Sequence, residues 1–517
     1  MTDGRYTLVL SRYRAVRPAR AGLPTPASEC RRLRFDAMTT DASDPAMSAA
    51  TSDTGLVRVL GAGMAIAIVV GNTIGSGIFA KPGRIAAEAG DFGLIISIWG
   101  VGALLCVLGA LCIAELSVML PRAGGLYVYL REAYGRLPAF LFGWQEIVLN
   151  RPASTGALAM ICVGAFGNAM GISLGPIETV TGASLVIAGM TAVNVFGVIW
   201  GGRMQVVTTV IKCKFVVFVA TLPFVLELGG RDVIDASLYS LKSEPKQSGL
   251  GGQVAAVLLA VMWAYNGWHG IAPVAEEVRD PQRNIPLALF GGIGVLALLY
   301  IGANIAYHAV IPMSEMALPE NQEHVAEVMV QRLLGPIGGS LMSVGVMLST
   351  LGAVNSNLLI SPRVAFAMGR DRVFFSRFAD VHARFRTPVI AILIQGLLAI
   401  GLVIASAVLV ASVDYFRDRS VFSLLTDCVI FVASIFYMLA VAAVVVLRRK
   451  QPDLERPYRT PFYPLVPAAY LTVYAWFLFN IFFAQPAEAL IGFGMIAAGL
   501  PIYRWFAGRG SQEISGD

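Results

Sequence analysis

The chain has 517 residues, of which 56% are hydrophobic and 14% are charged, and its formal net charge at pH 7 is +6. An ordinary soluble domain carries about 25% charged residues, so this composition excludes a soluble globular protein. The 4 histidines and 6 cysteines are scattered, without a CxxC spacing. They form no nucleophile-base pair or metal-ligand set, so we expect no enzyme, no cofactor and no metal site.

Residues 1–54 are rich in Arg, Ser, Thr, Ala and Pro and contain no apolar run long enough for a secretory signal. Two interpretations remain open. The segment is either a disordered cytoplasmic tail or the product of a start codon assigned too early, because Met38 and Met47 both precede the first apolar span.

Apolar runs of about 20 residues, the length that crosses a bilayer, recur from Leu60 to the C-terminus. We therefore expect an all-α polytopic membrane protein with twelve transmembrane helices. The approximate centres of these helices are Val69, Val101, Ile147, Ile187, Val216, Leu259, Leu298, Met347, Leu397, Ile435, Trp476 and Met495.

Basic residues are unevenly distributed between the two sets of loops. Seventeen Arg and Lys residues follow even-numbered spans, and eight follow odd-numbered spans. Loops rich in Lys and Arg stay in the cytoplasm. Both termini are therefore expected to be cytoplasmic, in agreement with an even number of spans.

The first span contains three glycines, Gly71, Gly75 and Gly77, within the sequence GNTIGSGIF. Glycine costs about 1 kcal/mol relative to alanine inside a helix. Close packing of neighbouring helices through small residues is one explanation. The other explanation is that the helix is interrupted at this point.

A second candidate interruption lies five helices later, where residues 263–270 read WAYNGWHG. Matching breaks in two five-helix halves are typical of inverted-repeat transporters, which bind their substrate between the breaks. Free amides at the start of a half-helix attract a carboxylate, and exposed carbonyls attract an ammonium group. A ligand that carries both groups is an amino acid.

Several charged residues lie inside spans, where a charged side chain has a high free-energy cost. Glu146 and Arg151 in the third span could be internal structural partners, but at a spacing of five positions they are poorly placed to pair directly on one helix face. We assign them no transport role. Glu115 lies near the cytoplasmic end of the second span, where we expect a solvated or capping residue. Lys212 and Lys214 are about 200° apart around the fifth helix, so only one of them can face the bundle.

Strings along residues 56–507 resemble the amino acid-polyamine-organocation superfamily, and in particular bacterial relatives of the L-type amino acid transporters. The first is GNTIGSGIF at 71–79. The further strings are ALCIAEL at 110–116, GGLYVY at 124–129, LPAFL at 137–141, WQE at 144–146, RP at 151–152, EEV at 276–278, GAVN at 352–355 and RPYRTP at 456–461.

The resemblance implies a LeuT-like fold, in which ten helices form a five-plus-five inverted repeat and two more follow at the C-terminus. It divides the chain into the tail 1–54, a ten-helix transport core at 55–450, helices eleven and twelve at 451–507, and a cytoplasmic tail at 508–517. The implied activity is sodium-independent transport of amino acids by alternating access. A sensor with the same fold that binds amino acids without moving them is the alternative.

The resemblance also assigns binding roles to residues at the two breaks. Amides around Ser76, Gly77 and Ile78 are expected to hold the substrate carboxylate, so a bulky side chain at Gly77 is expected to fill the space that this group needs. The carbonyls of Ile74 and of residues 263–265 are expected to hold the amino group, and Trp263 is expected to close over the substrate. The full predicted set is Ile74, Gly75, Ser76, Gly77, Ile78, Trp263, Ala264, Tyr265, Asn266, Gly267 and Asn355, with His269 as a further candidate for the pocket wall.

Lys212 matches the position at which related transporters hold a sodium ion, and a snorkelling lysine is the alternative. The loop after the third span has no cysteine, so no disulfide-linked ancillary subunit is expected. The expected partners are an amino acid and the lipid bilayer, without nucleic acid, and the expected location is a bacterial inner membrane. Because no acidic residue interrupts the first, sixth or eighth span, neutral amino acids are favoured over cationic ones.

Overall fold

The computed structural model describes residues 58–514 except 197, 246–248, 383, 384, 386 and 415–419, and it leaves out the side chains of 198–203 and 507–514. The prediction for residues 1–54 therefore lies outside the described residues. Within the described part every regular element is helical, apart from a single bridge between Leu60 and Val278.

The first half of the chain contains a run of helices that begins with three short pieces. The α-helices are α1 (Ala62–Thr73), α2 (Gly77–Ala80), α3 (Pro82–Ala89), α4 (Phe92–Met119), α5 (Leu126–Tyr134), α6 (Arg136–Gln145), α7 (Arg151–Met170), α8 (Pro176–Val195) and α9 (Val198–Leu228). A π-helical turn, Glu146–Asn150, joins α6 to α7, and a 3₁₀ turn spans Ala236–Ser240.

The second half begins with another interrupted helix. Its α-helices are α10 (Leu250–Tyr265), α11 (Pro281–Val310), α12 (Met313–Met316), α13 (Val325–Leu334), α14 (Pro336–Ile360), α15 (Pro362–Arg370), α16 (Val389–Ser412), α17 (Val421–Lys450), α18 (Leu465–Ala484) and α19 (Pro486–Ile514). Short 3₁₀ turns span Ala272–Glu277 and Ser376–Ala379.

Eleven helical segments of the described residues are long and apolar enough to cross a membrane, which establishes a multi-pass membrane protein. The predicted span centred at Leu259 is α10, an apolar helix of only 16 residues. It is short because it stops at the second break. All twelve predicted centres lie in helices.

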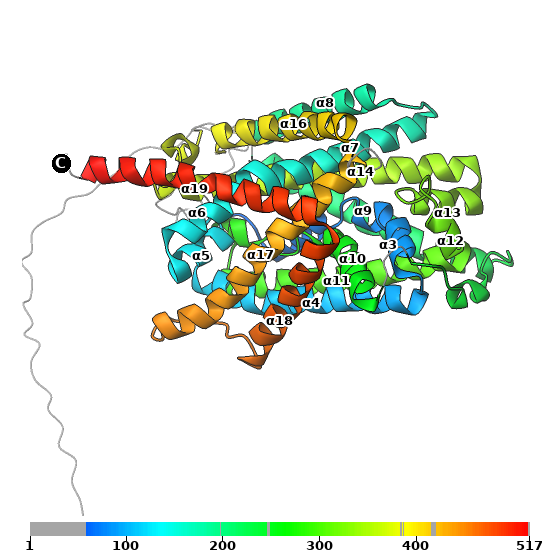
Figure 1. Ribbon diagram of the computed structural model, residues 1–517, viewed down its shortest axis with the longest axis horizontal. Helices are drawn as coiled ribbons and strands as arrows, with labels where there is room; N and C mark the ends of the chain where they lie inside the picture. The colour runs from blue at the N-terminus through cyan, green and yellow to red at the C-terminus, as the bar shows by residue number, and fades with distance from the viewer. Residues whose placement is uncertain are drawn as a thin grey trace, which may run out of the picture. The chain divides into compact units, whose positions relative to one another are not determined.

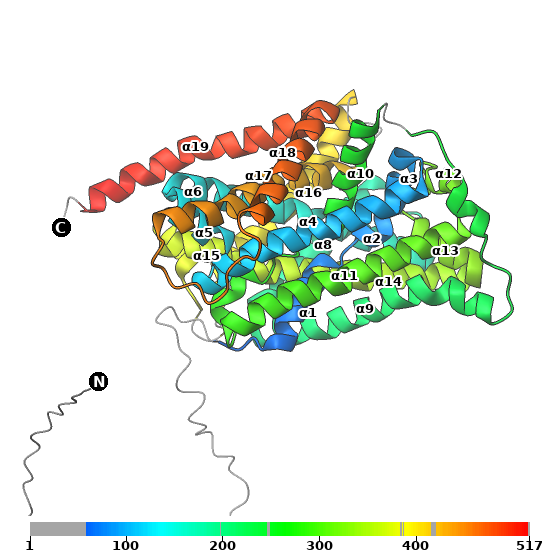
Figure 2. The same cartoon turned by 90° about the horizontal axis from the view of Figure 1, so that it is seen from below.

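The interrupted helices lie inside a bundle whose long helices run in a common direction (Figures 1 and 2). α1 packs against α9 and α11, while α7 packs against α14. The short helices α3, α12 and α13 lie at one end of the bundle, and α5 lies at the opposite end (Figures 1 and 2). Figure 2 places α15 beside α5 at that second end. The two breaks are therefore enclosed by longer helices.

Candidate functional site

The first break separates α1 from α2. The helix α1 ends at Thr73, and Ile74 has an extended backbone with φ −69° and ψ 96° before α2 resumes at Gly77. The glycines also permit close packing. A Cβ atom on Gly71 would lie 2.0 Å from Thr209 Oγ1, and one on Gly77 would lie 2.4 Å from Ala264 Cα. Both explanations of the glycines therefore hold, because the helix is interrupted here and the glycines also allow close packing.

The second break follows Tyr265, where α10 ends. Asn266 is extended, with φ −59° and ψ 137°, and Gly267 has φ 103°. This positive φ favours glycine. A side chain on Gly267 would also collide with Asn72, because its Cβ would lie 2.5 Å from Asn72 Nδ2. Local conformation and close packing both require glycine here.

Polar side chains tie the two breaks together. Asn72 Nδ2 donates to the Gly267 carbonyl at 2.9 Å, and Ser356 Oγ donates to Asn72 Oδ1 at 3.2 Å. The Tyr300 hydroxyl of α11 lies 3.2 Å from the Thr73 carbonyl and 3.0 Å from the Ala264 carbonyl. Sequence reasoning missed Asn72 and Tyr300, although a polar side chain in an apolar span was a usable signal.

Lys212 points from α9 into the first break. Its Nζ atom donates to the Gly71 carbonyl at 2.9 Å and to the Ile74 carbonyl at 2.8 Å. The lysine is only 1% exposed, whereas Lys214 lies on the exposed side of the same helix. The ammonium group therefore supplies a cation to backbone carbonyls that helix interruption leaves without their usual donors.

The carbonyls expected to hold a substrate amino group already have partners within the protein. The Ile74 carbonyl accepts from Lys212 Nζ, and the Ala264 carbonyl accepts from the Tyr300 hydroxyl. The Trp263 carbonyl accepts from the Asn266 amide at 3.1 Å. Each carbonyl has two lone pairs, so a second donor can still bind, and the predicted role of these carbonyls stays a prediction.

Trp263 lies over the first break. Its Nε1 atom lies 3.4 Å from Ser76 Oγ, and its ring meets Phe422 of α17 edge to face at 5.9 Å between centroids. Trp263 and Phe422 together cover the segment at Ser76 on the side of the bundle from which α17 begins. This arrangement suits an aromatic lid.

The predicted wall residues are not all at the breaks. Asn355 accepts from Asn194 Nδ2 at 2.9 Å and lies 3.5 Å from Gln205 Oε1, so its amide is directed towards α8 and α9. Asn266 is partly exposed and accepts from the Tyr437 hydroxyl at 2.9 Å. The buried His269 ring lies 4.7 Å from the Tyr437 ring. Of the two predicted wall residues Asn266 and Asn355, Asn266 is thus the better placed to line a pocket at the breaks.

The expectation that Glu146 and Arg151 are poorly placed to pair directly is wrong. Arg151 Nε lies 2.8 Å from Glu146 Oε2, and both residues are buried. Glu146–Asn150 forms a π-helical turn, in which the Arg151 amide donates to the Glu146 carbonyl. This i to i+5 geometry stacks residues five positions apart on one face. Arg151 also reaches Asn357 of α14 at 3.2 Å.

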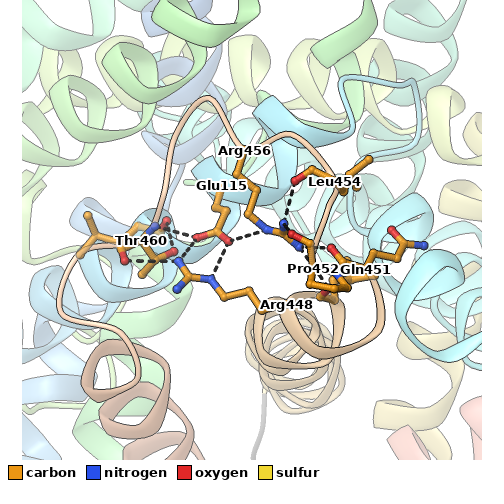
Figure 3. Close-up of polar contacts among 9 residues, drawn as sticks. Glu115, Arg448, Gln451, Pro452, Leu454, Arg456 and Thr460 are labelled. Atoms are coloured by element: carbon orange, nitrogen blue, oxygen red, sulfur yellow. Dashed lines mark hydrogen bonds and ion pairs between the residues drawn. The ribbon is translucent and has the colours of Figure 1, made fainter. Parts of the chain in front are cut away.

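The interpretation of Glu115 as a solvated or capping residue is also wrong. Glu115 is 1% exposed and accepts from Arg448 of α17 at 2.9 and 2.7 Å. Its carboxylate lies between Arg448 and Arg456, and the Thr460 amide donates to it at 2.7 Å (Figure 3). Glu115 therefore connects α4, α17 and the loop before α18.

Further ion pairs join elements at the end of the bundle that carries α5 and α15. Glu277 pairs with Arg363 at 3.0 Å, and both side chains are buried. Glu276 pairs with Arg370 at 3.4 Å and accepts from the Ala123 amide at 2.8 Å. These contacts link the segment after the second break to α15 and to the start of α5.

The geometry defines a class of protein: a multi-pass helical membrane protein with two buried, mutually bonded helix breaks. A sequence profile described as amino acid permease matches residues 60–506. The chain therefore belongs to the amino acid permease family, whose members are transporters and not enzymes. The resemblance to the amino acid-polyamine-organocation superfamily is confirmed.

Individual relatives cover nearly the whole chain. The serine/threonine exchanger SteT of Bacillus subtilis is 32% identical over 456 residues, which cover 88% of this chain and 98% of SteT. The mouse large neutral amino acids transporter small subunit 2 is 31% identical, over 87% of this chain and 81% of its own. The rat b(0,+)-type amino acid transporter 1 is 29% identical, over 94% of each chain.

Proposed function

We propose that this permease exchanges neutral amino acids across the membrane by alternating access and without sodium. It would do so with a LeuT-like core of ten helices in a five-plus-five inverted repeat, followed by two C-terminal helices. The observation that carries the proposal is the Lys212 ammonium, bonded to the Gly71 and Ile74 carbonyls of the first break. A protein cation at this junction removes the need for a bound sodium ion.

Substrate recognition would combine the two breaks. The amides of Ser76, Gly77 and Ile78 open a half-helix, where partial positive charge favours a carboxylate. The carbonyls around Trp263 and Tyr265 would accept from the amino group. The names of SteT and of the mouse relative support neutral substrates.

The proposed orientation places both termini in the cytoplasm of a bacterium and the α12–α13 end outside its inner membrane. The excess of Arg and Lys in the loops after even-numbered spans supports this orientation. We further propose that the transporter works without a disulfide-linked subunit, because the loop of residues 171–175 between α7 and α8 has no cysteine.

Counterflow in proteoliposomes tests the function directly. Vesicles that contain the purified protein are loaded with one unlabelled amino acid from a panel and diluted into a trace of labelled amino acid, with choline in place of sodium. Neutral amino acids should drive exchange without sodium. A strict sodium requirement would contradict the proposal, and binding without exchange would indicate the sensor alternative.

A further inference from the structure

A cavity of about 360 Å³ lies at the end of the bundle that carries α5 and α15 (Figure 2). This volume is within the range of about 300–1,000 Å³ found for small-molecule sites. Apart from Pro121, every residue that lines the cavity is charged: Arg58, Arg122, Arg131, Glu276, Arg370 and Asp371. None of them belongs to the predicted substrate-binding set. In the proposed orientation this end faces the cytoplasm.

Positive charge exceeds negative charge around this cavity. Four arginines line it, against two carboxylates. Arg131 binds Asp371 and also Glu132, which lies outside the lining, and Arg370 pairs with Glu276 at 3.4 Å. All three carboxylates therefore already have a cationic partner, and the four arginines still outnumber them.

Arg58 and Arg122 supply the guanidinium groups that have no partner within the protein. In the described part of the chain, neither side chain has an ion pair or a hydrogen bond. Arg370 uses only one of its nitrogen atoms, Nη1, on Glu276. A guanidinium group carries five N–H donors in a planar fork, and this fork matches the oxygens of a phosphate group. Three arginines of the lining therefore have donors that an anionic ligand can use.

Hydrogen bonds hold the backbone of both arginines in place. The amide of Leu60, two residues after Arg58, donates to the Glu277 carbonyl at 3.0 Å. The amide that follows Arg122 donates to Glu276 Oε2 at 2.8 Å. Both arginines are thus anchored to the segment that follows the second break, and their backbone positions are fixed before a ligand binds.

We propose that this cavity binds a phosphate-bearing anion, either a soluble one or the headgroup of an anionic lipid. The phosphate oxygens accept from Arg58, Arg122 and Arg370. Basic pockets between membrane helices on the cytoplasmic side bind the headgroups of anionic lipids in this way. The anion connects the segment before α1 to the loop before α5 and to the end of α15.

The bound anion slows exchange. Opening of this end in an alternating-access cycle would separate the three parts that the anion connects, so the anion stabilises the closed state. This regulatory effect rests on the proposed transport function, whereas binding of the anion does not.

Thermal melting of the purified protein in a neutral detergent tests binding without transport. Potassium phosphate is compared with potassium chloride at equal pH and ionic strength, so that general screening of charge is the same in both samples. Phosphate that binds the folded state should raise the melting temperature of the wild type by about 1–3 °C. The double variant Arg58→Gln, Arg122→Gln should lose this shift. Equal shifts in the wild type and the double variant would overturn the inference.

A second arm identifies the source of the anion. Short-chain phosphatidylglycerol replaces inorganic phosphate, and short-chain phosphatidylcholine, which has no net charge, is its control. A shift with inorganic phosphate assigns the cavity to a soluble anion, and a shift with phosphatidylglycerol alone assigns it to a lipid headgroup. Absence of a shift with both probes would show that the cavity is not an anion site.

The double variant Arg136→Gln, Arg283→Gln is the matched control. It removes the same charge from two arginines that are exposed and do not line the cavity. It should show the wild-type shift with either probe. If it loses the shift as well, the basic surface as a whole attracts the anion and the proposed site is wrong.

Exchange in proteoliposomes tests the regulatory effect. In phosphatidylcholine vesicles with chloride as the anion, the wild type and the Arg58→Gln, Arg122→Gln variant should exchange at equal rates, which also shows that the variant folds. The probe identified by melting, either inorganic phosphate on both sides or phosphatidylglycerol in the bilayer, should slow the wild type by about twofold or more and leave the variant unchanged. A wild type that binds the probe but exchanges at an unchanged rate would overturn the regulatory effect. A wild type that exchanges no amino acid contradicts the proposed function instead, while the melting shift still tests the site.

Discussion

Lys212 and Lys214 lie two positions apart on α9 but have opposite environments. Lys212 is buried with its Nζ atom at two carbonyls of the first break, and Lys214 is exposed. This contrast offers a matched pair of variants, because each removes one lysine from the same helix.

We predict that Lys212→Ala slows exchange by about tenfold or more. The Gly71 and Ile74 carbonyls lose a hydrogen bond to a charged donor, which is worth about 1.5–3 kcal/mol. Initial rates of uptake with choline in place of sodium measure the effect. Lys214→Ala should exchange at the wild-type rate. A wild-type rate for Lys212→Ala would show that the lysine is not needed at the break.

Glu146 and Arg151 form a buried ion pair, so removal of one partner leaves an uncompensated charge. We predict that Arg151→Met destabilises the protein by about 3–5 kcal/mol, whereas the double variant Glu146→Gln, Arg151→Met recovers part of the loss. Thermal melting of the purified proteins measures both.

The exposed Glu315–Arg332 pair is the control for this prediction. Its loss should change stability by less than about 1 kcal/mol. If the double Glu146 and Arg151 variant melts no higher than the single variant, the two charges do not stabilise each other.

At the level of helices, Gly77 is a point of close packing between α2 and α10, and its predicted role in substrate binding stays a prediction. Its Cα faces the backbone of α10, so that a Cβ atom would lie 2.4 Å from Ala264 Cα and 2.7 Å from Ala264 Cβ. A large side chain at Gly77 would therefore push α2 away from α10, whether or not a carboxylate binds there. Loss of transport in Gly77→Leu does not by itself locate the substrate.

We predict that Gly77→Ala lowers both the melting temperature and the exchange rate, because backbone atoms of α10 cannot yield to the methyl group. Gly63→Ala is the control in the same interrupted helix, because nothing lies within 4 Å of the added Cβ atom. It should be neutral or slightly stabilising. A Gly77→Ala protein with normal melting and normal exchange would contradict this packing argument.

The Glu115 cluster acts at the same level, because it connects α4 to α17 and to the loop before α18 (Figure 3). We predict that Glu115→Gln destabilises the protein by about 3 kcal/mol or more, since Arg448 and Arg456 then lose their shared carboxylate. Melting curves test this. The exposed Glu455→Gln variant, in the same loop, should melt like the wild type.

For the whole molecule, orientation in the membrane follows from the distribution of basic residues. We predict that Asn321→Cys, before α13, reacts with an impermeant thiol reagent added outside, and that Asp453→Cys, between α17 and α18, does not. The five described native cysteines are buried or partly buried, and all 6 cysteines of the chain are replaced before labelling. The reverse pattern would overturn the proposed orientation. Arg384, an equivalent cytoplasmic position, lies outside the described residues.

The sequence by itself determined the features that depend on composition and local pattern. Apolar runs of spanning length predict the long helices, because a bilayer leaves backbone groups no other partners. They do not predict the short helices α3, α5, α12, α13 and α15. Clustered glycines predict both helix breaks, because glycine is the residue that tolerates interruption and close approach. The two-residue spacing of Lys212 and Lys214 predicts that only one can face inward.

Only the tertiary structure decided which groups meet across the bundle. The partners of Asn72, Tyr300 and Glu115 come from distant segments, and one sequence carries no signal for such pairings. The prediction for Glu146 and Arg151 was wrong for a different reason. The prediction assumed an α-helix, but residues Glu146–Asn150 form a π-helical turn. The wider turn changes which side chains share a face.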